Sequence, residues 1–396
     1  MRGRLIAAAV VAVCALAALI YLTQTSTVPA MSPVEQMEEM PDLQTTPPVT
    51  EAGAQSADPV MELLASMTLE EKVGQLFLAR CPETDGAGEV SRLHLGGLLL
   101  FSRDFDGETS DSMSQKVLSY QEAAKIPLLI AVDEEGGTVT RISNHRAFRS
   151  QTFSSPRMLY SQGGMELVMK TEAEKAQLLN SLGINVNLAP VCDISTQSGA
   201  FMYRRSLGQS PEVTGEFAAG TIKTMAKWGV GAVMKHFPGY GNNGDTHTDI
   251  VVDRRSLEEL EAADLQPFFA GIEAGGGAIL VSHTVVQAMD PENPASLSPA
   301  VHRYLRLAMN FDGVILTDDL SMDAITQRYG AGEAAVLAVL AGNDLLCATE
   351  YEIQYDAVLA ACRQGRISTA LLEQAVYRVL LWKQSLGLCL PGCPVG

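Results

Sequence analysis

The chain has 396 residues, 47% of them hydrophobic, and its formal net charge at pH 7 is -18. This charge argues against a nucleic-acid-binding protein, because a surface that binds a polyanion has to be basic. The length leaves room for one large α/β domain after an N-terminal region of different character.

The first residues have the pattern of a targeting or anchoring segment. Arg2 and Arg4 precede an uninterrupted apolar run at residues 5–22. This run is long enough to cross a bilayer, and its positive flank is expected to stay cytoplasmic while the rest is exported. A cleaved signal peptide, cut near Ala30, is the alternative. We therefore predict a signal peptide or membrane anchor at residues 1–22 and an extracytoplasmic protein, either anchored or secreted.

Residues 23–58 are rich in Thr, Pro, Glu and Gln and show no apolar periodicity. Such a segment cannot bury enough apolar surface to fold, so we predict a disordered linker. The folded domain is then expected at residues 59–396.

The cysteines fall into two groups. Cys389 and Cys393 flank Leu-Pro-Gly and are close enough in sequence to pair in an oxidising compartment. The other cysteines of the domain show no metal-ligand spacing and are predicted to be buried thiols; they are Cys81, Cys192, Cys347 and Cys362.

Eight apolar runs of strand length alternate with amphipathic stretches in the domain. The runs occupy residues 73–79, 97–101, 127–133, 185–190, 230–236, 278–283, 313–318 and 344–348. Helical patterns between them include residues 170–181, 212–228, 257–274 and 333–341. Runs that are apolar on both faces are typical of covered parallel strands, so we predict a single (β/α)8 barrel of the TIM type. An open doubly wound sheet is the alternative, but no glycine fingerprint for a dinucleotide follows the first run.

Polar residues stand where several of these runs end. Asp133 closes the third run, Lys235 and His236 the fifth, His283 the sixth and Asp318 the seventh. In a barrel, the C-terminal ends of the strands meet at one face, where active sites are built. A single such residue could be a helix cap or a satisfied core group, but several at matching ends indicate a site.

Asp318 follows an apolar run and is itself followed by Asp319. A carboxylate at the mouth of a strand can be held beside a reacting carbon as a nucleophile. The alternative is that one of the two caps the next helix. Asp318 ends the run, whereas Asp319 is better placed as a cap or a supporting group.

The segment from Lys235 to His247 reads KHFPGYGNNGDTH. Asp245 can accept a hydrogen bond from the imidazole of His247, which would orient the ring and raise its basicity, as in catalytic triads. Isolated Asp-x-His triplets are common in turns, but this one follows a polar strand end. Its glycines predict a loop that can close over a substrate.

Basic residues follow two further strand ends. Arg141 lies eight residues after Asp133, and carboxylates can hold sugar hydroxyls through charge-assisted hydrogen bonds. Arg204 and Arg205 lie in the loop after the fourth run. The alternatives are an ordinary turn with an exposed arginine and a surface pair. No His or Cys spacing indicates zinc, and no Walker-type loop indicates a nucleotide.

At these residues the chain resembles glycoside hydrolase family 3, specifically its β-N-acetylhexosaminidase branch, the NagZ-like enzymes. The similarity extends from residues 67–76 to residues 341–344 and so covers nearly the whole domain. Its most specific piece is K-H-F-P-G-x-G followed by D-x-H, which marks this branch rather than the β-glucosidases. The (β/α)8 barrel of the family agrees with the count of eight runs.

The resemblance implies a role for each candidate site residue. Asp318 would be the nucleophile that forms a covalent glycosyl-enzyme, His247 the general acid/base, and Asp245 its partner. The terminal sugar would be held by Asp133, Arg141, Arg205, Lys235 and His236. No metal or organic cofactor is needed.

The activity implied is that of a retaining exo-β-N-acetylglucosaminidase acting on terminal β-linked N-acetylglucosamine in peptidoglycan fragments or chitooligosaccharides. The expected partner is this carbohydrate, and a monomer is expected. The alternatives are a β-glucosidase of the same fold, a phosphorolytic family 3 enzyme and a non-catalytic glycan-binding barrel. The chain departs from the family at Tyr240, where relatives often have His, and also at Arg204 and Leu207. These departures concern loop shape and the preference for the neighbouring sugar.

Overall fold

The structure, a computed structural model, describes residues 58–246 and 250–393. The predicted signal or anchor at residues 1–22, and all but the last residue of the predicted linker, therefore lie outside the described residues. In the part of the chain that is described, no helix has both the length and the hydropathy that crossing a bilayer requires.

Eight parallel strands form one sheet in the order β10-β1-β2-β3-β4-β5-β7-β9. Their bounds are β1 (Phe77–Arg80), β2 (Gly97–Leu100), β3 (Leu129–Val132), β4 (Val186–Asn187), β5 (Gly231–Phe237), β7 (Ala278–Val281), β9 (Val314–Thr317) and β10 (Leu346–Ala348). The sheet curls back on itself, because a parallel bridge joins Leu316 of β9 to Leu345, the residue before β10. The result is the nearly closed parallel barrel that the eight apolar runs predicted, and not an open sheet. A separate short ladder pairs β6 (Val252–Asp253) with β8 (Val285–Val286).

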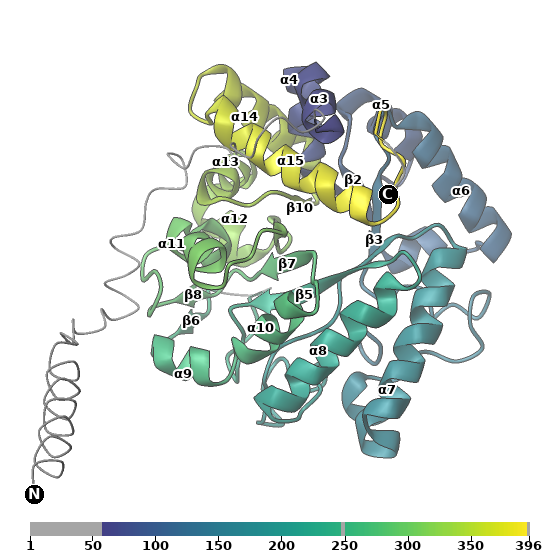
Figure 1. Cartoon of the computed structure of the whole chain (residues 1–396), viewed down its shortest axis with the longest axis vertical. Helices are drawn as coiled ribbons and strands as arrows, with labels where there is room; N and C mark the ends of the chain where they lie inside the picture. The colour runs from purple at the N-terminus through teal and green to yellow at the C-terminus, as the bar shows by residue number, and fades with distance from the viewer. Residues whose placement is uncertain (1–57, 247–249, 394–396) are drawn as a thin grey trace, which may run out of the picture. The chain divides into compact units, whose positions relative to one another are not determined.

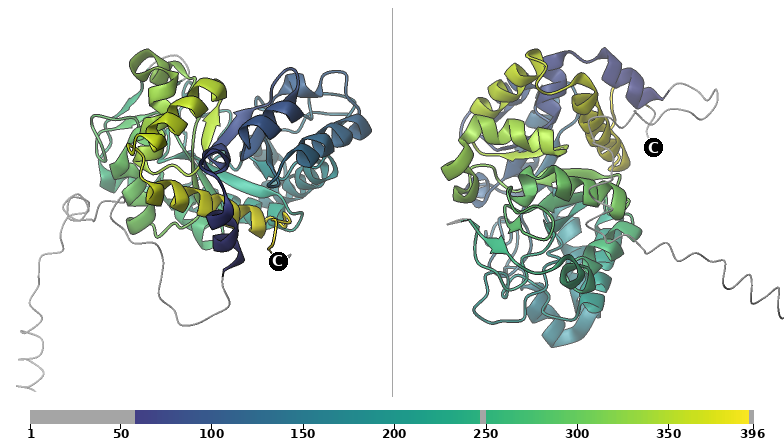
Figure 2. Two further views of the ribbon diagram at one scale, coloured as in Figure 1. Left: turned by 90° about the horizontal axis from the view of Figure 1, so that it is seen from above. Right: turned by 90° about the vertical axis from the view of Figure 1, so that its left-hand side faces the viewer.

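Helices surround the strands (Figures 1 and 2). They are α3 (Pro59–Ser66), α4 (Leu69–Gln75), α5 (Gly86–Leu93), α6 (Ser110–Ala123), α7 (Pro156–Ser181), α8 (Pro211–Ala226), α9 (Leu257–Ala262), α10 (Gln266–Glu273), α11 (Pro299–Arg303), α12 (Asp323–Tyr329), α13 (Ala331–Ala341), α14 (Tyr351–Arg363) and α15 (Thr369–Ser385). Short helical turns lie at η1 (Ser102–Phe105), η2 (Ala295–Leu297) and η3 (Tyr304–Ala308). Several helices begin at a Ser or Thr whose side chain accepts a hydrogen bond from the first turn, as Ser155 and Ser210 do.

The interior of the barrel is filled by apolar side chains from the strands, joined by two residues of α15. This cluster includes Leu78, Leu99, Leu129, Val186, Val233, Leu280, Leu316, Val379 and Trp382. Trp382 lies against the starts of β5 and β7, since a Cβ added at Gly231 or Gly277 would meet its indole at 3.0 and 2.7 Å. The N-terminal end of the barrel is thereby closed, and the opposite end is left for the site.

The first and last helices of the domain pack side by side (Figure 1). Lys72 of α4 forms an ion pair with Glu373 of α15 at 2.6 Å, and the Tyr377 hydroxyl donates to Asp58 Oδ2 at 2.7 Å. Contacts between residues so distant in sequence hold the two ends of the barrel chain together.

Two predicted elements were wrong in their bounds. The first apolar run was predicted as a strand from Val73, but residues up to Gln75 belong to α4, because Thr68 and Glu71 form a capping box that starts a helix. The helix predicted over residues 257–274 is divided into α9 and α10 at Ala263, whose backbone is not helical. Apolar periodicity alone did not reveal either boundary.

The prediction for the cysteines was right for three of four thiols. Cys81, Cys192 and Cys347 are buried, whereas Cys362 is only partly buried. Cys389 and Cys393 are present as free thiols, the first exposed and the second partly buried.

Candidate active site

A cleft of about 670 Å³ opens where the strands end, at the C-terminal side of the barrel. Seven of the eight predicted site residues line it: Asp133, Arg141, Arg205, Lys235, His236, Asp245 and Asp318. The eighth, His247, lies outside the described residues. Residues from five separate segments of the chain are thus brought to one cavity.

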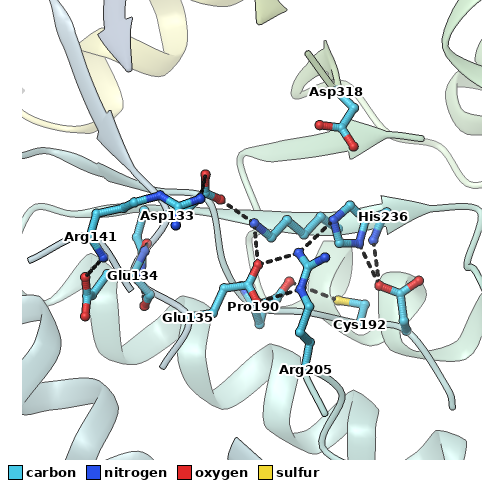
Figure 3. Close-up of polar contacts among 12 residues, drawn as sticks. Asp133, Glu134, Glu135, Arg141, Pro190, Cys192, Arg205, His236 and Asp318 are labelled. Carbon is cyan, nitrogen blue, oxygen red and sulfur yellow. Dashed lines mark hydrogen bonds and ion pairs between the residues drawn. The ribbon is translucent and has the colours of Figure 1, made fainter. Parts of the chain in front are cut away.

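A buried ion network forms one wall of the cleft (Figure 3). Lys235 Nζ lies 2.6 Å from Asp133 Oδ1 and 2.7 Å from Glu135 Oε1. Arg205 donates to the same Glu135 carboxylate from Nε at 3.0 Å and from Nη2 at 2.7 Å. Two cations and two carboxylates therefore hold one another in fixed positions, with charge-assisted hydrogen bonds throughout.

Both buried members of this network stay charged. Burial alone would raise the pKa of Glu135, but the charges of Arg205 and Lys235 lower it below its usual value. Burial alone would lower the pKa of Lys235, but the charges of Asp133 and Glu135 raise it. The network thus presents a permanent charged and hydrogen-bonding surface to a ligand.

His236 is held in one orientation and one tautomer. Its Nε2 lies 3.2 Å from Arg205 Nη2, which can only donate, so Nε2 accepts. The proton then resides on Nδ1, which donates to Asp193 Oδ2 at 2.8 Å. The backbone N of His236 donates to the same carboxylate oxygen at 3.1 Å. The His236 imidazole is therefore fixed in place next to Lys235.

A bulge in β5 lets both Lys235 and His236 reach the cleft. Lys235 pairs with Leu280 and Phe237 pairs with Val281, so the ladder skips His236. In a regular strand, neighbouring side chains point to opposite faces, and a bulge changes their direction. The local irregularity therefore accounts for two adjacent cleft-lining residues.

The loop after β3 is held from inside by Glu134. This fully buried carboxylate accepts hydrogen bonds from the backbone N of Arg141 and of Ile142, both at 2.8 Å, and from Ser143 Oγ at 2.5 Å. The Arg141 side chain then lies in the cleft, with its guanidinium 3.8 Å from Asp133 Oδ2 and its Cζ 5.5 Å from the Phe101 ring centre. An ordinary turn with an outward-facing arginine is excluded.

Asp318 directly follows β9 and is half-buried in the wall of the cleft. Its backbone N donates to Val281 O of β7 at 3.0 Å, and the N of Asp319 donates to Asp318 Oδ1 at 2.9 Å. Asp319 accepts hydrogen bonds from Ser321 N at 2.9 Å and Thr349 Oγ1 at 2.5 Å. The helix cap at the start of α12 is Met322, which makes no side-chain cap bond, so the capping alternative is wrong.

The loop after β5 begins with two tight turns. Gly239 and Gly241 have φ values of 118° and 55°, which favour glycine. Arg255 supports this part of the loop by donating to Gly239 O at 3.1 Å while paired with Asp253 and Asp264. Asp245 lies further along the loop, half-buried at the cleft.

His283, which ends the sixth predicted run, has a structural role. It is fully buried, with Nδ1 2.7 Å from Ser296 Oγ and Nε2 2.9 Å from Asp319 O, and it does not line the cleft. Here the alternative of a satisfied core group is correct.

Two site residues were missed by the sequence analysis: Glu135, which joins Arg205 to Lys235, and Asp193, which orients His236. Each is a carboxylate within three residues of the end of a predicted strand, and that position is the signal that could have identified them. In the described ranges, no group of three or more His, Cys, Asp or Glu residues is arranged to hold a metal ion.

Comparisons with known proteins find relatives that match most of the domain. The model of the glycosyl hydrolase family 3 N terminal domain matches residues 68–381. A β-hexosaminidase of Xylella fastidiosa is 31% identical over 315 residues, which are 78% of this chain and 92% of the relative. A family 3 β-N-acetylglucosaminidase structure from Paenibacillus sp. str. FPU-7 has a TM-score of 0.76 and 34% identity, and covers 81% of this chain and 63% of its own. The LpqI structure from M tuberculosis has a TM-score of 0.75 and 30% identity, covering 86% of this chain and 99% of its own.

Proposed function

The chain belongs to glycosyl hydrolase family 3, and we propose that this glycoside hydrolase is a retaining exo-β-N-acetylglucosaminidase. The observation that carries the proposal is the position of the Asp318 carboxylate, in the same cleft as the fixed ion network of Asp133, Lys235 and Arg205. Relatives named β-hexosaminidase and β-N-acetylglucosaminidase support the choice of sugar.

The ion network is proposed to hold the terminal sugar. Sugar hydroxyls are both donors and acceptors, and the network offers carboxylate oxygens on Asp133 and N–H groups on Lys235, Arg141 and Arg205. Because these groups are already fixed by one another, little side-chain freedom is lost when the sugar binds. His236 adds a further oriented ring to the same wall.

In the first step, Asp318 attacks the anomeric carbon and the glycosidic bond breaks. The leaving oxygen takes a proton from His247, which we propose as the general acid. The product of this step is a glycosyl ester on Asp318, and the released alcohol leaves. Support for this role of Asp318 comes from its site at the end of β9, where its backbone N donates to Val281 O of β7 and its Oδ1 accepts from the backbone N of Asp319.

In the second step, water attacks the anomeric carbon of this ester, the bond to the Asp318 oxygen breaks to release the carboxylate, and His247 takes a proton from the water. An imidazole suits both steps because its unperturbed pKa lies near neutrality. Asp245 is proposed to accept a hydrogen bond from His247 and to raise its basicity. Each step inverts the configuration of the anomeric carbon, so the β-configuration is retained overall.

Peptidoglycan fragments and chitooligosaccharides are the proposed natural substrates. The proposal that the protein is exported, and either anchored through its N-terminus or secreted, rests on the apolar run at residues 5–22 with Arg2 and Arg4 before it. Fractionation of expressing cells tests the location, since a purely cytoplasmic product would contradict it.

The activity is tested with an aryl β-N-acetylglucosaminide and the matching β-glucoside, each with and without inorganic phosphate. We expect cleavage of the first only, release of free N-acetylglucosamine, and no dependence on phosphate. Preference for the glucoside would refute the sugar assignment, and formation of a sugar 1-phosphate would indicate a phosphorylase.

The roles are tested with Asp318→Asn and His247→Ala. Each variant should have a strongly lowered kcat. When wild-type enzyme is quenched during turnover, its mass spectrum should show a fraction heavier by one N-acetylglucosaminyl group. Asp319→Asn is the matched control for Asp318→Asn, because it removes the neighbouring carboxylate charge. Equal activity of wild type and Asp318→Asn would refute the nucleophile.

A further inference from the structure

Tyr240 is a buried tyrosine in the loop after β5, and its hydroxyl contacts the far end of the same loop. The side chain is 1% exposed, and its hydroxyl oxygen lies 2.5 Å from Thr246 Oγ1. Thr246 is itself fully buried. Two hydroxyls, each able to donate and to accept, thus close a loop that starts at Tyr240 and returns beside Asp245.

The same tyrosine is tied to the wall that holds the sugar. Asp193 accepts from the backbone N of Tyr240 with Oδ1 at 2.7 Å and from the His236 ring with Oδ2 at 2.8 Å. The rings of His236 and Tyr240 also meet edge to face, with their centres 5.3 Å apart. A continuous chain of contacts therefore runs from Arg205 and His236 through Asp193 to Tyr240 and Thr246.

The tyrosine hydroxyl remains protonated in this setting. Burial and, next, the negative charge of Asp318 raise the pKa of Tyr240 well above its usual value. A neutral phenol can always share a hydrogen bond with the Thr246 hydroxyl, so the contact persists over the whole pH range in which a histidine can work as acid and base.

The ring and the hydroxyl of Tyr240 have separable roles. The ring packs against Val191, Met202 and Phe201, with its centre 5.7 Å from that of Phe201. This packing would be kept by phenylalanine. Within the described ranges the hydroxyl has one hydrogen-bond partner, Thr246, so its removal tests this loop contact.

We infer that Tyr240 and Thr246 form a hydroxyl latch that fixes the end of the loop that carries Asp245 at the cleft, and so positions Asp245, the proposed partner of the acid/base. Tyr240 is then a positioning residue, since it acts through the loop and not on the substrate. This inference rests on the proposed function, because it requires that the residues flanking Thr246 provide the acid/base pair.

The latch predicts a dependence on the leaving group. Departure of 2,4-dinitrophenolate needs little protonation, whereas departure of phenolate or a sugar alcohol needs an acid in place. For Tyr240→Phe we expect kcat/KM to fall by about tenfold or more on phenyl β-N-acetylglucosaminide and by less than about threefold on the 2,4-dinitrophenyl glycoside. The quantity kcat/KM is chosen because it reports the first chemical step with both substrates.

A merely structural tyrosine would give a different pattern. If Tyr240→Phe lowers kcat/KM equally on the two glycosides, or on neither, the latch is refuted. Tyr203→Phe is the matched control, because Tyr203 is a partly buried tyrosine whose hydroxyl makes no hydrogen bond within the described ranges. It should leave both rates within about twofold of wild type, as surface-like changes usually do.

Thr246 supplies a second, independent test. Thr246→Val should lower kcat/KM selectively on the phenyl glycoside, as Tyr240→Phe does, whereas Thr246→Ser should retain most of this activity. The double variant Tyr240→Phe with Thr246→Val should lose no more kcat/KM than either single variant. Additive losses would show that the hydroxyls act separately and would overturn the latch. A wild-type enzyme that cleaves neither glycoside would instead refute the proposed function, and the latch with it.

Discussion

Lys383 of α15 has no carboxylate partner among the described residues, and its replacement by methionine should stabilise the protein. The side chain is fully buried, and its only hydrogen bond within the described residues is to Gln75 Oε1 at 2.6 Å. Burial lowers the pKa of Lys383 from 10.5 to about 7. Methionine has a similar length and no charge to bury.

The magnitude follows from linkage between protonation and folding. Each pH unit between the two pKa values corresponds to about 1.4 kcal/mol, so burying the charged form of Lys383 costs the folded state about 5 kcal/mol. Below pH 7 both states bind the proton and the full cost applies. Between pH 7 and 10.5 only the unfolded state binds it, so the free energy of unfolding rises with pH in this range.

Methionine removes this cost but leaves Gln75 Oε1 without its donor, a loss of about 1–3 kcal/mol. At pH 6, Lys383→Met should therefore be more stable than wild type by about 2–4 kcal/mol. Near pH 10 the order should reverse, because the lysine is then neutral and still donates to Gln75.

Urea unfolding of wild type and variant at pH 6, 7.5, 9 and 10 measures this difference directly. Lys170→Met is the matched control, because Lys170 is exposed on α7, and it should change the stability little at every pH. If Lys383→Met destabilises the protein at pH 6, or shifts its stability equally at all pH values, the assignment of a buried lysine with a lowered pKa is refuted.

Two further predictions concern the site. Glu135→Gln removes the carboxylate that pairs with Arg205 and Lys235, so we expect the free energy of unfolding to fall by about 3–5 kcal/mol and KM for the N-acetylglucosaminide to rise. Thermal unfolding and steady-state kinetics test this, and an unchanged KM would contradict the role of the network in sugar binding. Gly239→Ala places a Cβ 2.6 Å from Asp264 Oδ1 at a φ of 118°, so it should destabilise the domain by about 1–3 kcal/mol and lower kcat. If the stability and kcat of the variant equal those of wild type, the loop tolerates a different backbone conformation and the prediction is wrong.

The barrel was accessible from sequence because its signal is local. A strand covered on both faces has to be largely apolar, and most of the eight runs meet that requirement, although Asn187 interrupts the fourth. Where a second local signal competes, as the capping box at Thr68 and Glu71 does, the apolar run is misleading and α4 extends into it.

Polar residues at strand ends were a good guide to the cleft but an incomplete one. Asp133, Lys235, His236 and Asp318 line it, whereas His283 is turned into the core and bonded to Ser296. All five have the same sequence pattern. Only their surroundings in three dimensions separate a cleft-lining group from a satisfied buried one.

The sequence by itself determined the eight apolar runs, the polar residues that end them and the motif that indicates the family, because these depend on which residues are present and how they are spaced. The tertiary structure decided which charges meet. Glu135 meets Arg205 and Lys235, which lie 70 or more residues further along the chain. The bulge at His236 lets the adjacent residues Lys235 and His236 line the same wall of the cleft. Such pairings depend on distances between strands and loops far apart in sequence, and no local pattern encodes them.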